Sequence, residues 1–174
     1  MCSANPAGER RRRRKTAAAT LAVVLAAATA GLAGPWTRPA AASALNERIV
    51  HDPYTGLALG GYDPVAYFTD GAAVRGRGIE VVWDGGYWRF ANPGNAAAFA
   101  AAPTVYAPLF GGHCAASLAR GALQPGDPEI FLIHRSRLLF FARAADRDAF
   151  LADPDGQLGR AFERWPTLSA VLAR

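Results

Sequence analysis

The sequence predicts a single small α+β domain. Segments 79–83 and 87–90 are rich in β-forming residues and flank Asp84-Gly85-Gly86, which is a hairpin signal. Segments 129–134 and 137–141 form a second pair of this kind. Helix-forming segments surround these hairpins instead of alternating with single strands, which favours α+β over a parallel α/β sheet. A chain of 174 residues is typical of one domain.

Residues 1–44 have the pattern of a secretory signal peptide. The basic run Arg10–Lys15 precedes the uncharged, alanine-rich segment Thr16–Gly34, and Ala42-Ser43-Ala44 is a small-residue cleavage pattern. Arginines before a mildly apolar core are similar to a twin-arginine signal. We therefore expect cleavage after Ala44 and a periplasmic or secreted protein. In the alternative, an uncleaved segment of this length anchors the chain in a membrane.

The charge of the remaining chain argues against nucleic acid as a partner. Residues 1–44 hold seven of the 19 basic residues and one of the 14 acidic ones. The rest of the chain therefore has 12 basic residues against 13 acidic ones, and the two kinds are interspersed. A nucleic-acid-binding domain carries a basic stripe, because phosphate neutralisation supplies most of its affinity.

The first half of the domain is expected to hold two capped helices. Residues 45–56 form an irregular lead-in. Asp63 stands directly before Pro64, so it caps a short helix that begins at that proline. Asn92 caps a second helix over residues 94–102, which ends before the next proline.

Three helices are expected in the second half. The first spans His113–Ala119, and the others span residues 144–152 and 157–165. The last of them is expected to stop at Pro166, because proline removes a helical hydrogen bond. Residues 169–174 form a C-terminal tail. No internal repeat is visible in the domain.

Several motifs of the domain are similar to those of exported YHS-domain proteins. The motifs are Gly61–Phe68 followed by Thr69-Asp70-Gly71, Tyr87–Ala91, Tyr106-Ala107-Pro108, Gly111–Ala115, Pro125–Pro128 and Trp165-Pro166. The resemblance covers residues 57–168. It implies a YHS/TRASH-like core, and a protein that binds a metal ion or a small ligand.

The same resemblance argues against the metal site of the wider family. Metal-binding members carry cysteines at the positions that are Ala66, Ala91 and Asn95 in this sequence. A zinc or soft-metal site needs about four nitrogen or sulfur ligands. We therefore expect the domain to fold without a structural metal.

Cys114 is the only cysteine after residue 44, and it supports two interpretations. In one, it lies in the first turn of a helix beside His113, where it is a reactive thiol or a ligand for copper or zinc. Such a thiol could also form a disulfide-linked dimer. In the other, it is a small buried apolar residue, since free cysteine is among the most buried residue types.

The aromatic residues of the first half support two interpretations as well. They form either the core of the domain or a pocket for a small ligand, with Tyr62 and Asp63 at its mouth. The aromatic residues are Tyr62, Tyr67, Tyr87, Trp88, Phe90, Phe99, Tyr106 and Phe110. No motif in the sequence supports an enzymatic activity.

Three function hypotheses follow. The first is an exported YHS-family binding protein whose cargo is a metal ion or a small ligand, with Cys114, His113, Asp63 and Tyr62 as candidate ligand residues. The second is a thiol-dependent redox protein that uses Cys114. The third is a non-catalytic accessory or interaction domain.

Overall fold

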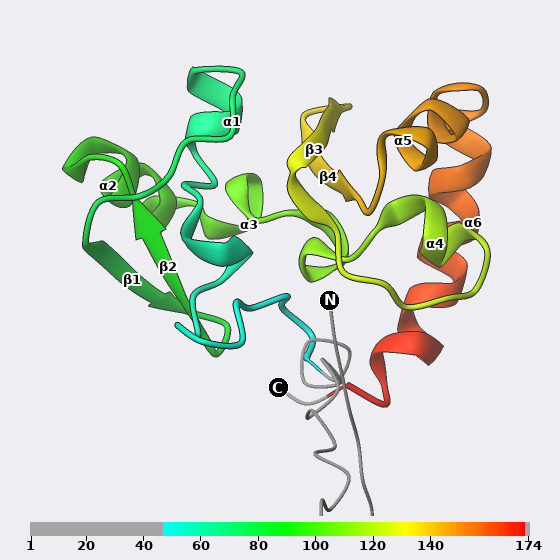
Figure 1. Cartoon of the computed structure of the whole chain (residues 1–174), viewed down its shortest axis with the longest axis horizontal. Coiled ribbons are helices and arrows are strands. Elements are labelled where there is room, and N and C mark those ends of the chain that lie inside the picture. Colours follow the sequence, from blue (N-terminus) through cyan, green and yellow to red (C-terminus); the bar gives the residue numbers. More distant parts are fainter. Residues whose placement is uncertain (1–46, 173–174) are drawn as a thin grey trace, which may run out of the picture. The chain divides into compact units, whose positions relative to one another are not determined.

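The computed structural model describes residues 47–172, which belong to one compact unit, Thr37–Arg174 (Figure 1). The expected signal peptide, with its cleavage site after Ala44, lies outside the described residues. The described part mixes helices with two small antiparallel hairpins, so the α+β prediction is confirmed at this level. Within residues 47–172, no helix combines the length and the apolar character that a membrane crossing requires.

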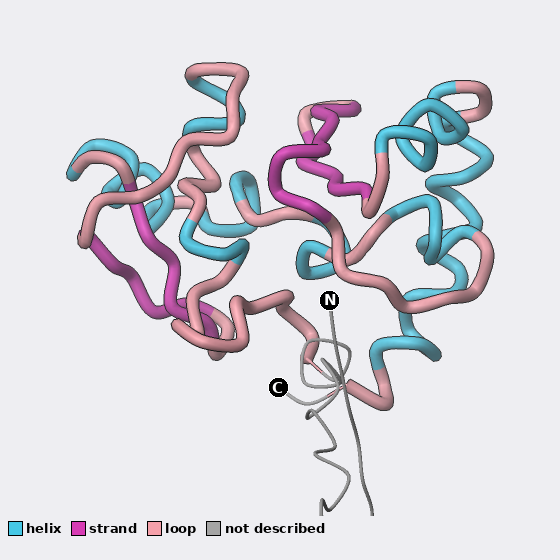
Figure 2. Tube along the Cα trace, in the orientation of Figure 1, coloured by secondary structure: helices cyan, strands magenta, loops and turns pink. Residues whose placement is uncertain are grey.

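Six elements follow one another and then recur in the same order, and Figure 2 shows the two hairpin–helix runs. The N-terminal repeat (residues 59–106) holds the 3₁₀ turn η2 Leu59–Gly61, α1 Ala66–Thr69, β1 Ile79–Trp83, β2 Gly86–Phe90, α2 Pro93–Ala101 and α3 Pro103–Tyr106. The C-terminal repeat (residues 109–169) holds η3 Leu109–Gly112, α4 Ala115–Ala119, β3 Asp127–His134, β4 Arg137–Phe141, α5 Ala144–Leu151 and α6 Pro154–Ser169. The structure therefore repeats an order of elements that is not visible in the sequence.

Backbone conformation supports the duplication residue by residue. The three consecutive residues that begin at Leu59 have φ values of 55°, 60° and 81°, and those that begin at Phe110, 51 positions later, have 59°, 61° and 92°. Left-handed backbone is uncommon outside glycine, so a shared run of three is a specific match. The hairpin turns repeat at the same spacing, with positive φ at Asp84 and again at Arg135.

Hydrogen bonds repeat in the same way. The backbone N–H of Gly76 donates to the carbonyl of Gly61 at 2.9 Å, and that of Gly126 donates to the carbonyl of Gly112 at 3.0 Å. The two donor residues are 50 positions apart, and the two acceptor residues are 51 positions apart. A register shift in β3 restores the spacing of 51 residues between equivalent positions before the second hairpin begins. The spacing between equivalent residues thus differs by one along the chain, and few equivalent side chains are identical. For these reasons the repeat is not visible in the sequence.

Both predicted hairpins are confirmed, but their strands are buried differently. In β2 the even positions Gly86, Trp88 and Phe90 are buried while the positions between them are not, so one face of the strand packs on the core. In β4 the four residues from Leu138 to Phe141 are all buried. A strand with both faces buried has a continuous apolar sequence, as this one does.

Strand β4 lies between two clusters of buried side chains. Leu138 and Phe140 pack with the first cluster, which also contains Trp88. Leu139 and Phe141 point to the opposite face and pack with the second cluster. The second repeat therefore supplies one strand to both cores. Cluster members from the N-terminal side are Ile49, Ala58, Leu59, Tyr62, Val65, Tyr67, Phe90, Ala96, Phe99 and Ala107, and those from the C-terminal side are Phe110, Cys114, Ala115, Ala116, Leu118, Ala119, Phe150, Leu158 and Ala161.

Two helix predictions need correction. The helix expected over His113–Ala119 begins at Ala115, because His113 is extended at the end of η3 (φ −71°, ψ 153°). The helix expected to stop at Pro166 is α6, which begins at Pro154 with Asp153 as its cap and runs through that proline to Ser169. The helix was expected to end at the proline because a proline removes one helical hydrogen bond. The remaining contacts of α6 outweigh that loss, so the helix continues.

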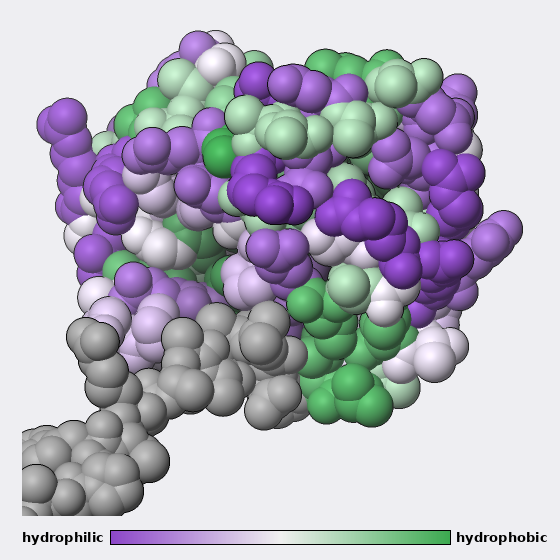
Figure 3. Space-filling model, turned by 45° about the vertical axis from the view of Figure 1, so that its right-hand side comes forward, coloured by the Kyte–Doolittle hydropathy of each residue, from purple (hydrophilic) through white to green (hydrophobic). Residues whose placement is uncertain are grey.

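The surface of the domain carries few large apolar side chains. Tyr87, which the sequence placed in the aromatic set, is 53% exposed, because it lies on the outer face of β2 opposite Val82. Figure 3 shows polar and apolar residues interspersed over one face, with an apolar area toward its lower edge.

Candidate functional site

Asp63 is a buried carboxylate that clamps three parts of the N-terminal repeat. Its Oδ1 accepts from the backbone N–H of Val65 at 2.9 Å and of Ala66 at 3.4 Å. The helix expected to begin at Pro64 begins at Ala66 with Val65 as its N-cap, so Asp63 holds the turn that precedes α1. Its Oδ2 accepts from the N–H of Ala91 at 2.8 Å and from Nδ2 of Asn95 at 2.7 Å. With 0% exposure and four donors, this carboxylate has a complete structural role.

These contacts bring together the three positions to which the sequence resemblance would assign the cysteines of metal-binding YHS proteins. Ala66, Ala91 and Asn95 all contact Asp63. Two of these positions offer no ligand atom, and the amide of Asn95 donates to the carboxylate. The residues present therefore do not fit, at this place, the metal ion that the resemblance would imply.

Tyr62 joins the two repeats. Its hydroxyl donates to Oε1 of Glu129 in β3 at 2.6 Å, and the guanidinium of Arg75 lies 4.4 Å from the ring centroid. The hydrogen bond to Glu129, together with burial, raises the pKa of Tyr62. Tyr67 makes a similar connection, since its hydroxyl donates to the carbonyl of Pro128 at 2.9 Å, and burial raises its pKa. Both tyrosines have structural partners.

Cys114 occupies the position in the C-terminal repeat that Asp63 has in the first, 51 residues earlier. It precedes α4, its backbone N–H donates to the carbonyl of Gln124 at 2.8 Å, and its side chain is 0% exposed. A thiol in this place packs as an apolar group. A reagent, a metal ion or a second chain could reach the sulfur only after local opening.

His113 is also fully buried. Its Nε2 lies 2.9 Å from the carbonyl of Glu47, and because a carbonyl only accepts, this nitrogen carries the proton. Nδ1 has no partner among the described residues. Burial lowers the pKa of His113, and the bond to Glu47 opposes this shift. Among residues 47–172 no group of three or more His, Cys, Asp or Glu side chains could hold a metal ion.

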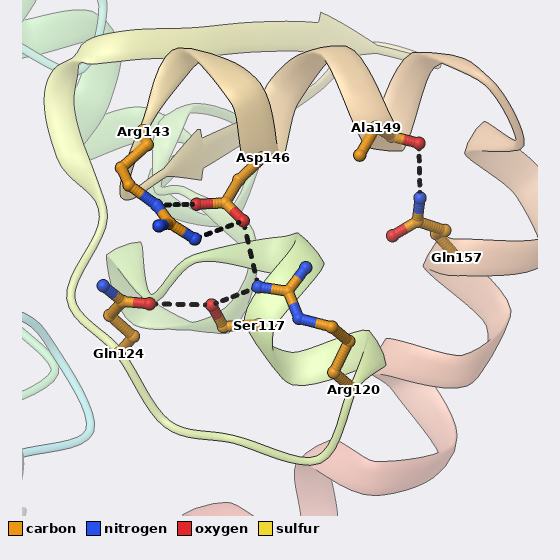
Figure 4. A network of polar contacts seen from close by, with 7 residues as sticks. All are labelled: Ser117, Arg120, Gln124, Arg143, Asp146, Ala149 and Gln157. Carbon is orange, nitrogen blue, oxygen red and sulfur yellow. Dashed lines mark hydrogen bonds and ion pairs between the residues drawn. The ribbon is translucent and has the colours of Figure 1, made fainter.

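A polar network stands between α4 and α5 in the C-terminal repeat (Figure 4). Asp146 accepts from Arg143 Nε at 2.9 Å and from Arg120 Nη2 at 2.9 Å. Ser117, which is buried, donates to Gln124 and accepts from Arg120. The hydrogen bonds from Arg143, and then those from Arg120, hold the pKa of Asp146 below its ordinary value.

Residues 47–52, here called the strap, cross from one repeat to the other. The N–H of Val50 donates to the carbonyl of Gly111, and the carbonyl of Val50 accepts from the N–H of Leu59. Glu47 contacts both His113, through its carbonyl, and His51, through a carboxylate oxygen 2.6 Å from Nδ1. The strap therefore packs on the domain, although it has no regular helix or strand.

A pocket of about 110 Å³ that is open to solvent lies beside the strap and is lined by both repeats. Trp83 and Trp88 come from the first hairpin, and Trp165 comes from α6. Arg48 of the strap and Asp84 of the β1–β2 turn also line it. We call it the tryptophan cavity. All three tryptophans within residues 47–172 line it.

The structure separates this cavity from the residues that the sequence singled out. Tyr62, Asp63, His113 and Cys114 do not line it. The nearest link is the ring of His113, whose centroid is 5.8 Å from that of Trp165. Three tryptophans in a small domain were the available signal, but nothing local in the sequence shows that residues 83 and 165 meet.

The cavity lining is polar as well as aromatic. Trp88 Nε1 donates to the carbonyl of Trp83 at 3.0 Å, so that indole N–H is already satisfied. Arg48 and Asp84 form no ion pair among the described residues. Trp88 is 1% exposed and the other two tryptophans are partly exposed, so the pocket presents little indole surface beside Arg48 and Asp84. Comparison of the chain with protein-family models, with curated proteins and with solved structures finds no match.

Proposed function

We propose that this chain is an exported binding protein of the YHS-domain family, and that it holds a small organic ligand in the tryptophan cavity. The observation that carries the proposal is the cavity itself, because tryptophans from both repeats line it together with an arginine and an aspartate. Binding sites are typically concave, rich in aromatic side chains and supplied with a few polar groups. The sequence motifs and the clustering of Ala66, Ala91 and Asn95 around Asp63 support the family assignment.

A small ligand is favoured over a metal ion as the cargo. The residues at the family's metal positions do not supply ligand atoms, and the His113–Cys114 pair is enclosed. The thiol-dependent redox alternative is less favoured for the same reason, since thiol chemistry needs access to the sulfur.

Tryptophan fluorescence tests the proposal directly. The chain has four tryptophans, and Trp36→Phe leaves only the three that line the cavity. The full chain with this substitution is titrated with glycine betaine, choline, acetate and glucose, and separately with Zn²⁺ and Cu⁺. We expect at least one organic probe to change the emission saturably. Trp165→Phe should weaken that binding, whereas Tyr54→Phe, at a side chain that is 95% exposed, should leave it unchanged.

Two results would contradict the proposal. One is a flat response to every organic probe. The other is a saturable response to Zn²⁺ or Cu⁺ alone that His113→Gln and Cys114→Ala abolish, which would favour the metal-binding alternative.

A further inference from the structure

We propose that the strap (residues 47–52) is a pH-sensitive latch, which is closed at neutral pH and opens more readily in acid, when His113 takes up a proton. This property goes beyond the proposed ligand binding, because it concerns how the strap is held on the domain and not what occupies the cavity. The main observation is a contact between the strap and a fully buried imidazole, a group that changes its charge near neutral pH.

The strap makes two hydrogen bonds to the C-terminal repeat within the described residues 47–172. The N–H of Val50 donates to the carbonyl of Gly111 at 2.8 Å, and the carbonyl of Glu47 accepts from Nε2 of His113 at 2.9 Å. Between these two bonds, Ile49 is 5% exposed and packs with the first core cluster. Because one of only two hydrogen bonds comes from His113, the protonation state of this side chain affects how firmly the strap is held.

The enclosed site of His113 fits the neutral imidazole and not the charged one. With the proton on Nε2, the other ring nitrogen, Nδ1, has a lone pair and no hydrogen-bond partner among the described residues. A second proton places an N–H group and a unit of charge at this nitrogen, inside a site with 0% exposure. A buried charge without a partner is strongly unfavourable. Opening of the strap removes the cover that Glu47 provides and lets water reach the ring.

An aromatic ring and backbone carbonyls surround His113. The ring of Trp165 in α6 has its centroid 5.8 Å away, and the nearby carbonyls are those of Glu47 and of Gln124, which precedes β3. The carbonyl of Gln124 already accepts from the N–H of Cys114 at 2.8 Å. Burial lowers the pKa of His113, the two carbonyls oppose this shift, and no charged side chain contributes to it.

The titratable side chains near this site are paired elsewhere, exposed or uncharged. The carboxylate of Glu47 lies 2.6 Å from Nδ1 of His51, so this pair is internal to the strap. In α6, Glu163 and Arg164 flank Trp165 and are exposed, and Arg164 donates to a backbone carbonyl of α4. The thiol of Cys114 packs in the second core cluster. The closed state therefore offers no counter-charge to a protonated His113.

The pH dependence has a definite direction. In the open state His113 has the ordinary pKa of about 6.5, so the open state takes up the proton before the closed state does as the pH falls. The equilibrium constant for opening is therefore constant above about pH 6.5 and rises by up to about tenfold per pH unit below it. Because Arg48 and Ile49 line the tryptophan cavity, opening removes part of the cavity wall.

Amide hydrogen exchange of the full chain measures the opening. The reporter is the N–H of Val50, and the amides of β4 report unfolding of the whole domain. After correction for the intrinsic exchange rate, we expect the protection of Val50 to fall by about fivefold to thirtyfold between pH 7.5 and pH 5. At both pH values the β4 amides should remain better protected than Val50, since opening of the strap leaves the cores folded.

Substitutions of the three histidines identify the group that titrates. The double variant His51→Gln, His134→Gln leaves His113 as the only histidine, and it should keep the fall in protection. His113→Gln retains a donor for the carbonyl of Glu47 and cannot be protonated, so it should remove the fall. The double variant does not touch the buried site, and it decides the question even if His113→Gln does not fold.

Four results would overturn the latch. The first is a protection of Val50 that does not change with pH in the wild type. The second is equal protection of Val50 and the β4 amides, because the strap then opens only when the whole domain unfolds. The third is loss of the pH dependence in the double variant, and the fourth is its persistence in folded His113→Gln.

Discussion

At the scale of single residues, the duplication allows one position to be compared in two environments. Asp63 and Cys114 are equivalent, and both are fully buried. The carboxylate has four hydrogen-bond donors around it, whereas the thiol packs among alanines and leucines of the second core. A buried charge needs such partners and a buried thiol does not. The side chain, and not the backbone, therefore decides what this position does.

The burial of Cys114 predicts a protected thiol. In a Cys2→Ser background, iodoacetamide should label the native protein at least about 100-fold more slowly than the denatured protein, because labelling requires local opening. Cys114→Ser should reduce the free energy of unfolding by about 1–3 kcal/mol, since a hydroxyl replaces a buried apolar group. Rapid labelling of the native thiol would instead revive the reactive-cysteine and disulfide-dimer hypotheses.

The burial of His113 predicts a dependence of stability on pH. Its pKa in the folded protein is below the ordinary value of 6.5, so the unfolded chain takes up the proton first as the pH falls. The contribution of His113 is therefore complete above about pH 6.5 and decreases as the pH falls from there through the folded pKa. Urea unfolding at pH 8 and at pH 5 measures this loss.

The matched variant is His113→Gln, which keeps a donor for the carbonyl of Glu47 and cannot be protonated. It should lose less stability than the wild type between the two pH values. His134→Gln, at a surface pair with Asp155, serves as the control. Equal losses in wild type and His113→Gln would show that another group is responsible.

At the scale of the elements, α5 is held to α4 by the carboxylate of Asp146. This side chain is 5% exposed, while its partners Arg143 and Arg120 are largely in solvent. In the first repeat the equivalent residue is Asn95, which donates to Asp63. Each repeat thus fixes its second helix through a polar residue at the same position, but with different chemistry.

Asp146→Asn should lower the free energy of unfolding by about 1–3 kcal/mol, because it weakens charge-assisted hydrogen bonds to two arginines. Asp148→Asn is the matched control on the same helix. Its carboxylate is 68% exposed and lies as far as 3.8 Å from Nε of Arg147. We therefore expect the free energy of unfolding to change by less than about 0.5 kcal/mol. Chemical denaturation of the two variants checks the difference. Equal effects would mean that the buried network adds nothing beyond a surface pair.

The turns η2 and η3 provide a second matched pair. Gly60 and Gly111 have φ values of 60° and 61°. A Cβ on Gly60 would meet no described atom within 4 Å, whereas one on Gly111 would lie 1.7 Å from the carbonyl oxygen of Arg48. The backbone strain of an alanine is thus the same at both positions, and only Gly111→Ala also displaces the strap.

Gly60→Ala should therefore lower the free energy of unfolding by about 1–2 kcal/mol, which is the cost of left-handed backbone. Gly111→Ala should cost about 1–3 kcal/mol more, as an overpacked site does, and it should alter the tryptophan emission because the strap lines the cavity. Urea unfolding followed by fluorescence measures both effects. Indistinguishable variants would show that the strap yields freely at this contact.

At the scale of the whole domain, strand β4 is shared by the cores of the two repeats. Its side chains alternate between the two cores, and Tyr67 of the first repeat contacts Phe131 and Phe140 of the second, with ring centroids 4.7 and 5.3 Å apart. Neither core is complete without this strand.

We therefore expect a single unfolding transition. Leu138→Ala removes a side chain from the first core and Leu139→Ala one from the second, and each should cost about 2–5 kcal/mol. In a Trp36→Phe, Trp165→Phe background, tryptophan fluorescence reports the first core through Trp83 and Trp88, and circular dichroism reports the helices of both repeats. The two signals should change together in both variants. Separate transitions would show that the repeats unfold independently.

The sequence alone determined the local elements of this protein. Turn residues between β-forming segments placed both hairpins, and Asn92 marked a helix start, because these signals act within a few residues of the chain. Where longer-range contacts outweighed a local signal, as at Pro166 in α6, the sequence-based boundary was wrong.

Three features became visible only in the tertiary structure, namely the duplication, the burial of Cys114 and the tryptophan cavity. The burial of Cys114 follows from packing against β4, which comes later in the chain. The cavity requires Trp83 and Trp165 to meet, and that meeting depends on how the repeats pack on the shared strand. Local patterns carry no information on such contacts, because packing and solvent exclusion are properties of the assembled core.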